Sequence, residues 1–281
     1  MSSGPEEFQA RAGKDLMRGI DTSVPHSARI WNYWLGGKDN FAVDQEAGDQ
    51  YARLFPGIFD LAKAERAFLG RVIRYLVGEA GVQQFLDVGT GLPTEDNTHQ
   101  VAQALAPECR VIYVDSDPLV LAHAQALLVS SPEGATAYID ADMRDPDRIL
   151  GQTVSLLDFD RPIGLLFMGV LGHITDDAEA RGIVSRLVEA LPSGSYLALN
   201  DGANTDAEFN RAQQSYDDTG AVPYRLRSPD EIARFFEGLE VVDPGVVPIP
   251  LWRPDLGDPG APRAMNAVGG VARKAWPGDS R

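Results

Sequence analysis

Residues 85–94 read FLDVGTGLPT, a short apolar run that carries one acid and ends in two glycines one residue apart. Glycine permits positive φ, and a helix that follows such a turn presents free backbone N–H groups to a ligand. The dinucleotide-binding fingerprint requires a third glycine where this chain has Thr94, and Asp87 would repel a pyrophosphate. The acid instead suits a ligand with a cationic amino-acid group. We therefore predict a ligand-binding turn at a strand end, with a plain glycine turn as the alternative.

Short apolar runs alternate with amphipathic segments after this turn. Strands are expected at 85–88, 111–114, 135–139, 165–168 and 196–199, and helices at 101–105, 119–128 and 183–191. Continuous apolar runs are typical of strands buried on both faces, and their alternation with helices indicates a parallel sheet with right-handed crossovers. The pattern predicts an α/β, Rossmann-like fold.

The two flanks of this region have different patterns. Residues 27–78 are rich in aromatic side chains at helical spacing, with breaks at Gly36-Gly37 and Pro56-Gly57. Near the other end, a helix at 229–236 and strands at 239–242 and 267–272 suggest a hairpin at the sheet edge. We expect three parts, namely a mobile tail over 1–22, an N-terminal helical cap over 23–80 and one α/β domain over 81–281.

Composition limits the function classes. Hydrophobic residues make up 44% of the 281 residues. The chain has 25 Lys and Arg against 41 Asp and Glu, which gives a formal net charge of −16. A surface of this charge repels phosphate backbones and anionic lipid, so neither nucleic acid nor a membrane surface is an expected partner. The single cysteine, Cys109, excludes an intrachain disulfide. With no apolar segment suited to a signal peptide or a membrane span, we expect a cytoplasmic protein; the oligomeric state is not predicted.

Acids follow the second and third strands. Asp115 lies 24 residues after the second glycine of the turn and is placed to accept ribose hydroxyl hydrogen bonds. Asp117 is better explained as the N-cap residue of the helix that begins at Pro118. After the third strand, Asp142 is suited to an adenine amino group and Met143 to the purine face, the alternative being a solvated acidic loop.

His173 follows the fourth strand, at the rim where ligands of open α/β sheets bind. A catalytic role is one interpretation, and a hydrogen-bonded structural histidine is the other. The four histidines and one cysteine show no zinc spacing, and neither a nucleophile elbow nor a P-loop lysine is present. No metal is expected.

Taken together, these segments resemble class I S-adenosylmethionine-dependent methyltransferases. The resemblance is closer to the largely actinobacterial S-adenosyl methyltransferase family, long filed as a domain of unknown function. It rests on Ser27-Ala28-Arg29, NYWLGGKDNF at 32–41, GTGLPT at 89–94 with Asn97 and His99, YVDSDP at 113–118, GVLGH at 169–173 and RSP at 227–229. The match runs from about Ser23 to Lys274, although the wider superfamily usually carries glycine where this chain has Pro93.

The resemblance implies a seven-stranded, mostly parallel sheet with an antiparallel last strand, and S-adenosylmethionine as cofactor. By this analogy the first glycine turn surrounds the methionine portion, the second strand end holds the ribose and the third frames the adenine. The expected cofactor-binding residues are Asp87, Gly89, Thr90, Gly91, Asp115, Ser116, Asp142, Met143 and Gly169. The catalytic candidates are His173 and Tyr33, and the substrate-binding candidates in the cap are Arg29 and Asn40.

Methyl transfer from a sulfonium depends mainly on alignment and water exclusion, and requires neither a metal nor a covalent nucleophile. We therefore expect a methyltransferase whose acceptor is a small molecule, with the cap closing over the cofactor and shaping the acceptor site. The alternative is a module that binds S-adenosylmethionine without turnover, since no indispensable base is evident. A nicotinamide oxidoreductase is disfavoured by Thr94 and Asp87.

Overall fold

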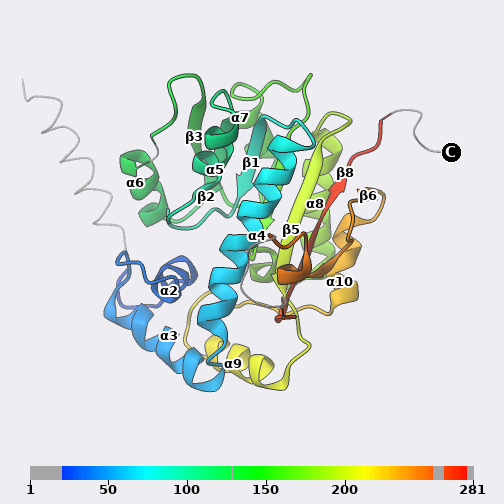
Figure 1. Ribbon diagram of the computed structural model, residues 1–281. Helices are drawn as coiled ribbons and strands as arrows, with labels where there is room; N and C mark the ends of the chain where they lie inside the picture. The colour runs from blue at the N-terminus through cyan, green and yellow to red at the C-terminus, as the bar shows by residue number, and fades with distance from the viewer. Residues whose placement is uncertain (1–20, 128, 256–262, 277–281) are drawn as a thin grey trace, which may run out of the picture.

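The computed structural model describes residues 21–127, 129–255 and 263–276, and the tail expected over 1–22 lies outside them up to residue 20 (Figure 1). Within these residues the centre of the molecule is an eight-stranded sheet. Its strands are β1 Gln84–Val88, β2 Arg110–Asp115, β3 Ala135–Asp140, β4 Gly164–Met168, β5 Tyr196–Gly202, β6 Glu240–Val241, β7 Val247–Pro248 and β8 Ala267–Arg273.

The strand order is β3-β2-β1-β4-β5-β8-β6, with β7 also paired to β8. Strands β1 to β5 are mutually parallel, whereas β8 runs antiparallel to β5. The predicted Rossmann-like sheet with an antiparallel last strand is therefore confirmed, and the strand beyond the expected seven is the two-residue β7. The order reverses between β1 and β4, and ligands of open α/β sheets bind at such a switch point.

Helices cover both faces of the sheet (Figure 1). One face packs against α4 (Ile58–Gly78) and α5 (Thr98–Leu105), and the other against α7 (Pro146–Thr153), α8 (Asp177–Ala190), α10 (Pro229–Ala233) and the 3-10 turn Arg234–Phe236. Neighbouring residues of β1 serve different faces: Phe85 packs with α4, and Leu86 packs on the opposite side. This alternation follows from the two-residue period of a strand. Helix α6 (Pro118–Leu127) lies beside β3.

The N-terminal helices lie beyond the carboxyl ends of the strands. Helix α2 (Ser27–Trp34) packs on α3 (Ala42–Leu54) and on α4, and α3 also packs on α9 (Ala207–Asp217). Buried side chains of α4 share one core with those of β1, β2 and β5, so this helix joins the N-terminal helices to the sheet. None of the described helices is long and apolar enough to cross a membrane.

Candidate functional site

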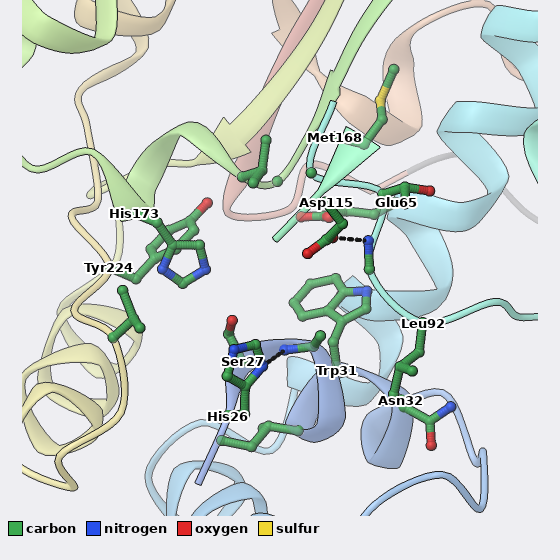
Figure 2. A pocket seen from close by; sticks show the side chains of 18 of the residues that line it. His26, Ser27, Trp31, Asn32, Glu65, Leu92, Asp115, Met168, His173 and Tyr224 are labelled. Atoms are coloured by element: carbon green, nitrogen blue, oxygen red, sulfur yellow. Dashed lines mark hydrogen bonds between the residues drawn. The ribbon is translucent and has the colours of Figure 1, made fainter. Parts of the chain in front are cut away.

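A cavity of about 380 Å³ lies at the carboxyl ends of the parallel strands, and α2 and α4 supply much of its wall (Figure 2). All nine of the predicted cofactor-binding residues line it, and so does His173. The volume falls within the range of small-molecule sites, and the position is the one expected at a switch point. Sequence reasoning and topology therefore converge on one place.

The glycine turn after β1 takes a conformation that requires glycine. Gly89 and Gly91 have φ of 72° and 65°, in the left-handed region. A Cβ on Gly89 would collide with Val170, whereas above Gly91 the space is open. The Gly89 N–H donates to the Val114 carbonyl at 2.8 Å, which ties the turn to the end of β2.

Asp115, at the end of β2, organises the neighbouring backbone. Its carboxylate accepts the N–H groups of Gly91 at 2.8 Å, Ser116 at 2.8 Å and Asp117 at 3.0 Å. Burial raises the pKa of Asp115, and these hydrogen bonds oppose the rise. Asp117 caps α6 by accepting the N–H of Leu119 at 2.8 Å, so the N-cap interpretation of this residue agrees with the geometry. Asp115 is the one of the two acids that lines the cavity.

Asp87, in β1, is a second buried acid on the cavity wall. Burial raises the pKa of its carboxyl to about 6, the Thr98 hydroxyl and Arg66 oppose the rise, and the charge of Asp115 adds to it. The Thr98 hydroxyl donates to the carboxylate at 2.7 Å. A carboxylate placed this way attracts a positively charged group and repels a pyrophosphate.

The loop after β3 contributes Asp142 and Met143. The Asp142 carboxylate accepts the N–H of Arg144 at 2.9 Å, and Met143 packs against the core on one side of the sheet. Arg144 also donates to the His173 carbonyl at 2.9 Å, so it links the loops that follow β3 and β4. The predicted residues thus occupy successive strand ends across β3, β2, β1 and β4.

Glu65, on α4, faces the cavity and was not predicted. Only 7% of its surface is exposed, and a Cβ placed on Gly169 would lie 2.7 Å from its Oε2 atom. Burial raises the pKa of Glu65 to about 8; the Asn200 side chain and Arg66 oppose the rise, and Asp201 adds to it. A signal was present in the sequence, because Glu65 lies four residues after Leu61 and three before Phe68, on the buried face of the helix.

His173 ends a 3-10 turn after β4 and borders the cavity. Its Nδ1 atom lies 3.1 Å from the Pro223 carbonyl, and its ring meets Tyr224 edge-on at 5.0 Å between centroids. Because a carbonyl only accepts, Nδ1 carries the proton and Nε2 is left as an acceptor. Burial lowers the pKa of His173, which favours the neutral form of the ring.

A buried network supports the turn that carries His173. Arg227 is fully buried and donates to Asp201 Oδ2 at 3.1 Å and to the carbonyls of Leu171 at 3.0 Å and Ile174 at 2.6 Å. The Tyr224 hydroxyl donates to the other carboxylate oxygen of Asp201. Sequence reasoning gave these residues no role, although Arg227 and the residues after Gly169 belong to the segments that carry the family resemblance.

Aromatic side chains from α2, α3, α9 and the loop before α10 line the remaining wall of the cavity. In Figure 2, Trp31 projects from α2 toward Asp115, with His173 and Tyr224 on the opposite side of the view. The aromatic members of the wall are Trp31, Trp34, Tyr51, Phe209, Tyr216 and Tyr224. Such a wall suits a flat or apolar small molecule.

The three cap residues chosen from the sequence do not line this cavity. Arg29 forms a buried ion pair with Asp44, the Tyr33 hydroxyl donates to Asp49 at 2.6 Å, and Asn40 donates to Asn32 at 2.8 Å. Arg29 and Tyr33 lie four residues apart, on the face of α2 that meets α3. Asn40 meets the cavity only through Asn32, which does line it.

The charges of the cavity indicate which ligand fits. The carboxyl groups of Glu65 and Asp87, which are buried, and of Asp115, which is half-buried, border it. The cations in the lining are the half-buried Arg66 and the exposed Arg144. Uncompensated buried acids favour a positively charged ligand. S-adenosylmethionine carries a sulfonium and an ammonium group, so the residues present fit it. Among the described residues, no group of three or more His, Cys, Asp or Glu is arranged to hold a metal ion.

Comparison with known proteins identifies the family of this chain. The family described as S-adenosyl methyltransferase matches residues 13–275. A DUF574 family protein from Streptomyces avermitilis MA-4680 is 45% identical with a TM-score of 0.86, over 90% of this chain and 99% of that one. A Thermobifida fusca YX protein with a provisional methyltransferase description is 38% identical with a TM-score of 0.84, over 92% and 98%.

A more distant likeness concerns the fold alone. Human N-acetylserotonin methyltransferase, solved with S-adenosylmethionine, is 12% identical with a TM-score of 0.50, over 95% of this chain and 67% of that one. Comparison with curated proteins gives no match.

Proposed function

This chain belongs to the S-adenosyl methyltransferase family, and we propose that the methyl acceptor is a small molecule held in the cavity beside the cofactor. The chain is an S-adenosylmethionine-dependent methyltransferase. One observation carries the proposal about the acceptor: a single cavity extends from the acidic strand ends to an aromatic wall. A wall of this kind encloses a small ligand better than it accommodates a macromolecular surface.

The order of the strand ends supports an orientation for the cofactor. Asp142 and Met143 border the adenine, Asp115 the ribose, and Asp87 with the Gly89 turn the methionine portion. The reacting end then lies near Gly169, at the end of β4, and the acceptor lies toward β5 and the aromatic wall. Gly202 and Tyr224, both of which line the cavity, border that region.

The bound cofactor supplies an electrophilic methyl group, and the chain supplies alignment, water exclusion and a proton acceptor. Trp31 and the helices around it cover the strand ends and exclude water. Neutral His173 accepts the proton of the acceptor nucleophile at Nε2. The network of Arg227, Asp201 and Tyr224 holds the histidine in place.

In this proposal the cap residues do not contact the ligand and act by positioning helix α2. Arg29, Tyr33 and Asn40 fix the position of α2 through Asp44, Asp49 and Asn32. The alternative, a module that binds the cofactor without turnover, is not favoured, because the family is one of methyltransferases.

The acceptor is tested by incubating the protein with methyl-labelled S-adenosylmethionine and fractionated small-molecule extract. We expect label in a low-molecular-weight product that is heavier than its precursor by one methylene. The control is the same incubation with protein or RNA fractions in place of small molecules. Label transferred only to those macromolecules would contradict the proposal.

A further inference from the structure

We propose that Glu65 is the counter-ion of the donor's sulfonium group, and that it lets the protein distinguish charged S-adenosylmethionine from neutral-sulfur S-adenosylhomocysteine. The inference rests on the proposed placement of the cofactor. It adds a function to a buried acid that lies outside the glycine turn.

The position of Glu65 is the first argument. Its Oε2 atom faces Gly169, at the end of β4, and β4 pairs with β1, which carries Asp87. The carboxyl therefore borders the cavity at the switch point between β1 and β4. An adenosyl group laid from β3 to β2 brings its 5′ substituent, which carries the sulfonium, to this point.

The second argument is that no cation in the described part of the chain forms an ion pair with Glu65. No ion pair to Glu65 occurs within 4.0 Å among residues 21–127, 129–255 and 263–276. Arg66 is near, but its Nη2 atom donates to the carbonyls of Glu95 at 3.1 Å and Asp96 at 2.7 Å. A buried carboxyl without a paired cation either keeps its proton or awaits a cationic ligand.

The surrounding groups determine when the proton leaves. Glu65 is influenced by Arg66 from its own helix, by Asn200 and Asp201 from β5, and by Tyr224 from the loop before α10. Burial outweighs Asn200 and Arg66, which favour the ionised carboxylate, and raises the pKa of Glu65 to about 8. At pH 7 the ligand-free protein is then mostly protonated at this site.

A sulfonium beside the carboxyl reverses this balance. A neighbouring positive charge stabilises the ionised form, so binding of the donor releases the Glu65 proton to the buffer. The demethylated product has a neutral sulfide, and the carboxyl keeps its proton when this product binds. The attraction exists only while the donor carries its charge, and it therefore favours donor over product.

Isothermal titration calorimetry at pH 7 in two buffers of different ionisation enthalpy counts the protons released on binding. We titrate wild type and Glu65→Gln with S-adenosylmethionine and with S-adenosylhomocysteine. Because both nucleosides carry an amino group, the readout is the difference between wild type and variant. We expect additional release that approaches one proton for the wild type with the donor, and close to none with the product.

The ratio of the Kd for S-adenosylhomocysteine to the Kd for S-adenosylmethionine gives a second readout. Glu65→Gln should lose about tenfold of the preference for the donor, whereas the control Asp60→Asn, an exposed acid on the same helix, should keep it. An unchanged ratio in Glu65→Gln would overturn the inference.

If the variant does not fold, the wild type alone still decides, since equal proton release with both nucleosides contradicts the inference. Failure of either nucleoside to bind the wild type is a different result. It would refute the cofactor site itself, and the role of Glu65 with it.

Discussion

Asp115 combines two functions in one carboxylate, because it accepts three backbone N–H groups and also faces the cavity. Asp115→Ala should weaken S-adenosylmethionine binding by about 1.5–3 kcal/mol, the scale of a hydrogen bond to a charged group. Calorimetry measures this directly. Asp140→Ala is the matched control, since Asp140 is the exposed β3 residue paired with Asp115. Unchanged affinity in Asp115→Ala would remove the residue from the site.

The Nδ1 atom of His173 faces the Pro223 carbonyl, which assigns the proton to Nδ1 and leaves Nε2 as the acceptor. His173→Ala should therefore lower turnover by about 10²–10⁴-fold, the usual range for a general base, with little change in cofactor affinity. Turnover of the acceptor and calorimetry with the cofactor separate these effects. His123→Ala is the control, because His123 lies outside the cavity lining. Parallel losses of turnover and affinity would indicate a structural role.

The buried acids also make stability depend on pH. The folded-state pKa of Glu65, about 8, lies above its ordinary value of 4.5, and the pKa values of Asp87 and Asp201, about 6, are raised as well. When its pKa is raised by folding, a carboxyl group contributes its full stabilisation at pH values below its pKa in the unfolded protein, where it is protonated. This contribution is lost as the pH rises through the pKa that the group has in the folded protein. Stability should therefore fall between about pH 5 and 8, with Glu65 responsible for the upper part.

Glu65→Gln should remove the part of the stability loss that occurs near pH 8. At pH 8 the variant should be more stable than ligand-free wild type by up to about 4 kcal/mol, since each pKa unit corresponds to about 1.4 kcal/mol. At pH 5 the difference should be small. Urea unfolding at both values measures it, and an equal pH dependence in the two proteins would contradict the assignment.

Residues at strand ends could be predicted from the sequence because parallel strands end at one edge. Gly89, Asp115 and Asp142 follow predicted strands, and they line one cavity. Glu65 was missed because it lies on a helix before the first strand, where periodicity shows the buried face but not what that face meets. Tyr33 was chosen from a motif, and a motif does not say which side of α2 faces the cavity.

At the scale of elements, the start of α2 depends on Asp44 of α3. The Asp44 carboxylate pairs with Arg29 and also accepts the N–H groups of His26 at 2.9 Å and Phe41 at 2.8 Å. Arg29→Ala leaves this carboxylate buried without its cation and should destabilise the protein by about 3–5 kcal/mol. Urea unfolding measures the loss, with the exposed Arg53→Ala as control. A loss no larger than that of the control would contradict a structural role.

The same helices are the segment that we expect the cofactor to order. Trp31 lines the cavity, so a cofactor bound there should slow the opening of α2. Limited proteolysis with and without S-adenosylmethionine should show slower cutting within residues 20–60 when the cofactor is present. Equal cutting in both states would count against closure of the cap.

Helices with a clear apolar stripe could be predicted from the sequence, whereas helix α9 was not predicted. Its sequence AEFNRAQQSYD is mostly polar, with Phe209, Ala212 and Tyr216 as its buried apolar residues. This stripe packs against α3, a contact between segments about 160 residues apart that sequence periodicity alone cannot reveal. The contribution of Tyr51, Phe209 and Tyr216 to the aromatic wall could not be predicted for the same reason.

At the scale of the whole molecule, the sheet fixes the strand ends and α4 joins them to the covering helices (Figure 1). The parallel direction of the central strands could be predicted because apolar strand runs alternate with helices, and the resemblance supplied the antiparallel last strand. The shape of the cavity could not, because it depends on how α2, α3 and α9 meet above that sheet. Because the net charge is −16, we expect the surface to repel a polyanion.

The most direct measurement of the central claim is a crystal structure of the protein with S-adenosylmethionine. We predict the adenine beside Met143, the ribose hydroxyls on Asp115 and the sulfonium between Asp87 and Glu65. A nucleoside bound elsewhere on the molecule, or a cavity that stays empty at saturating ligand, would contradict this assignment.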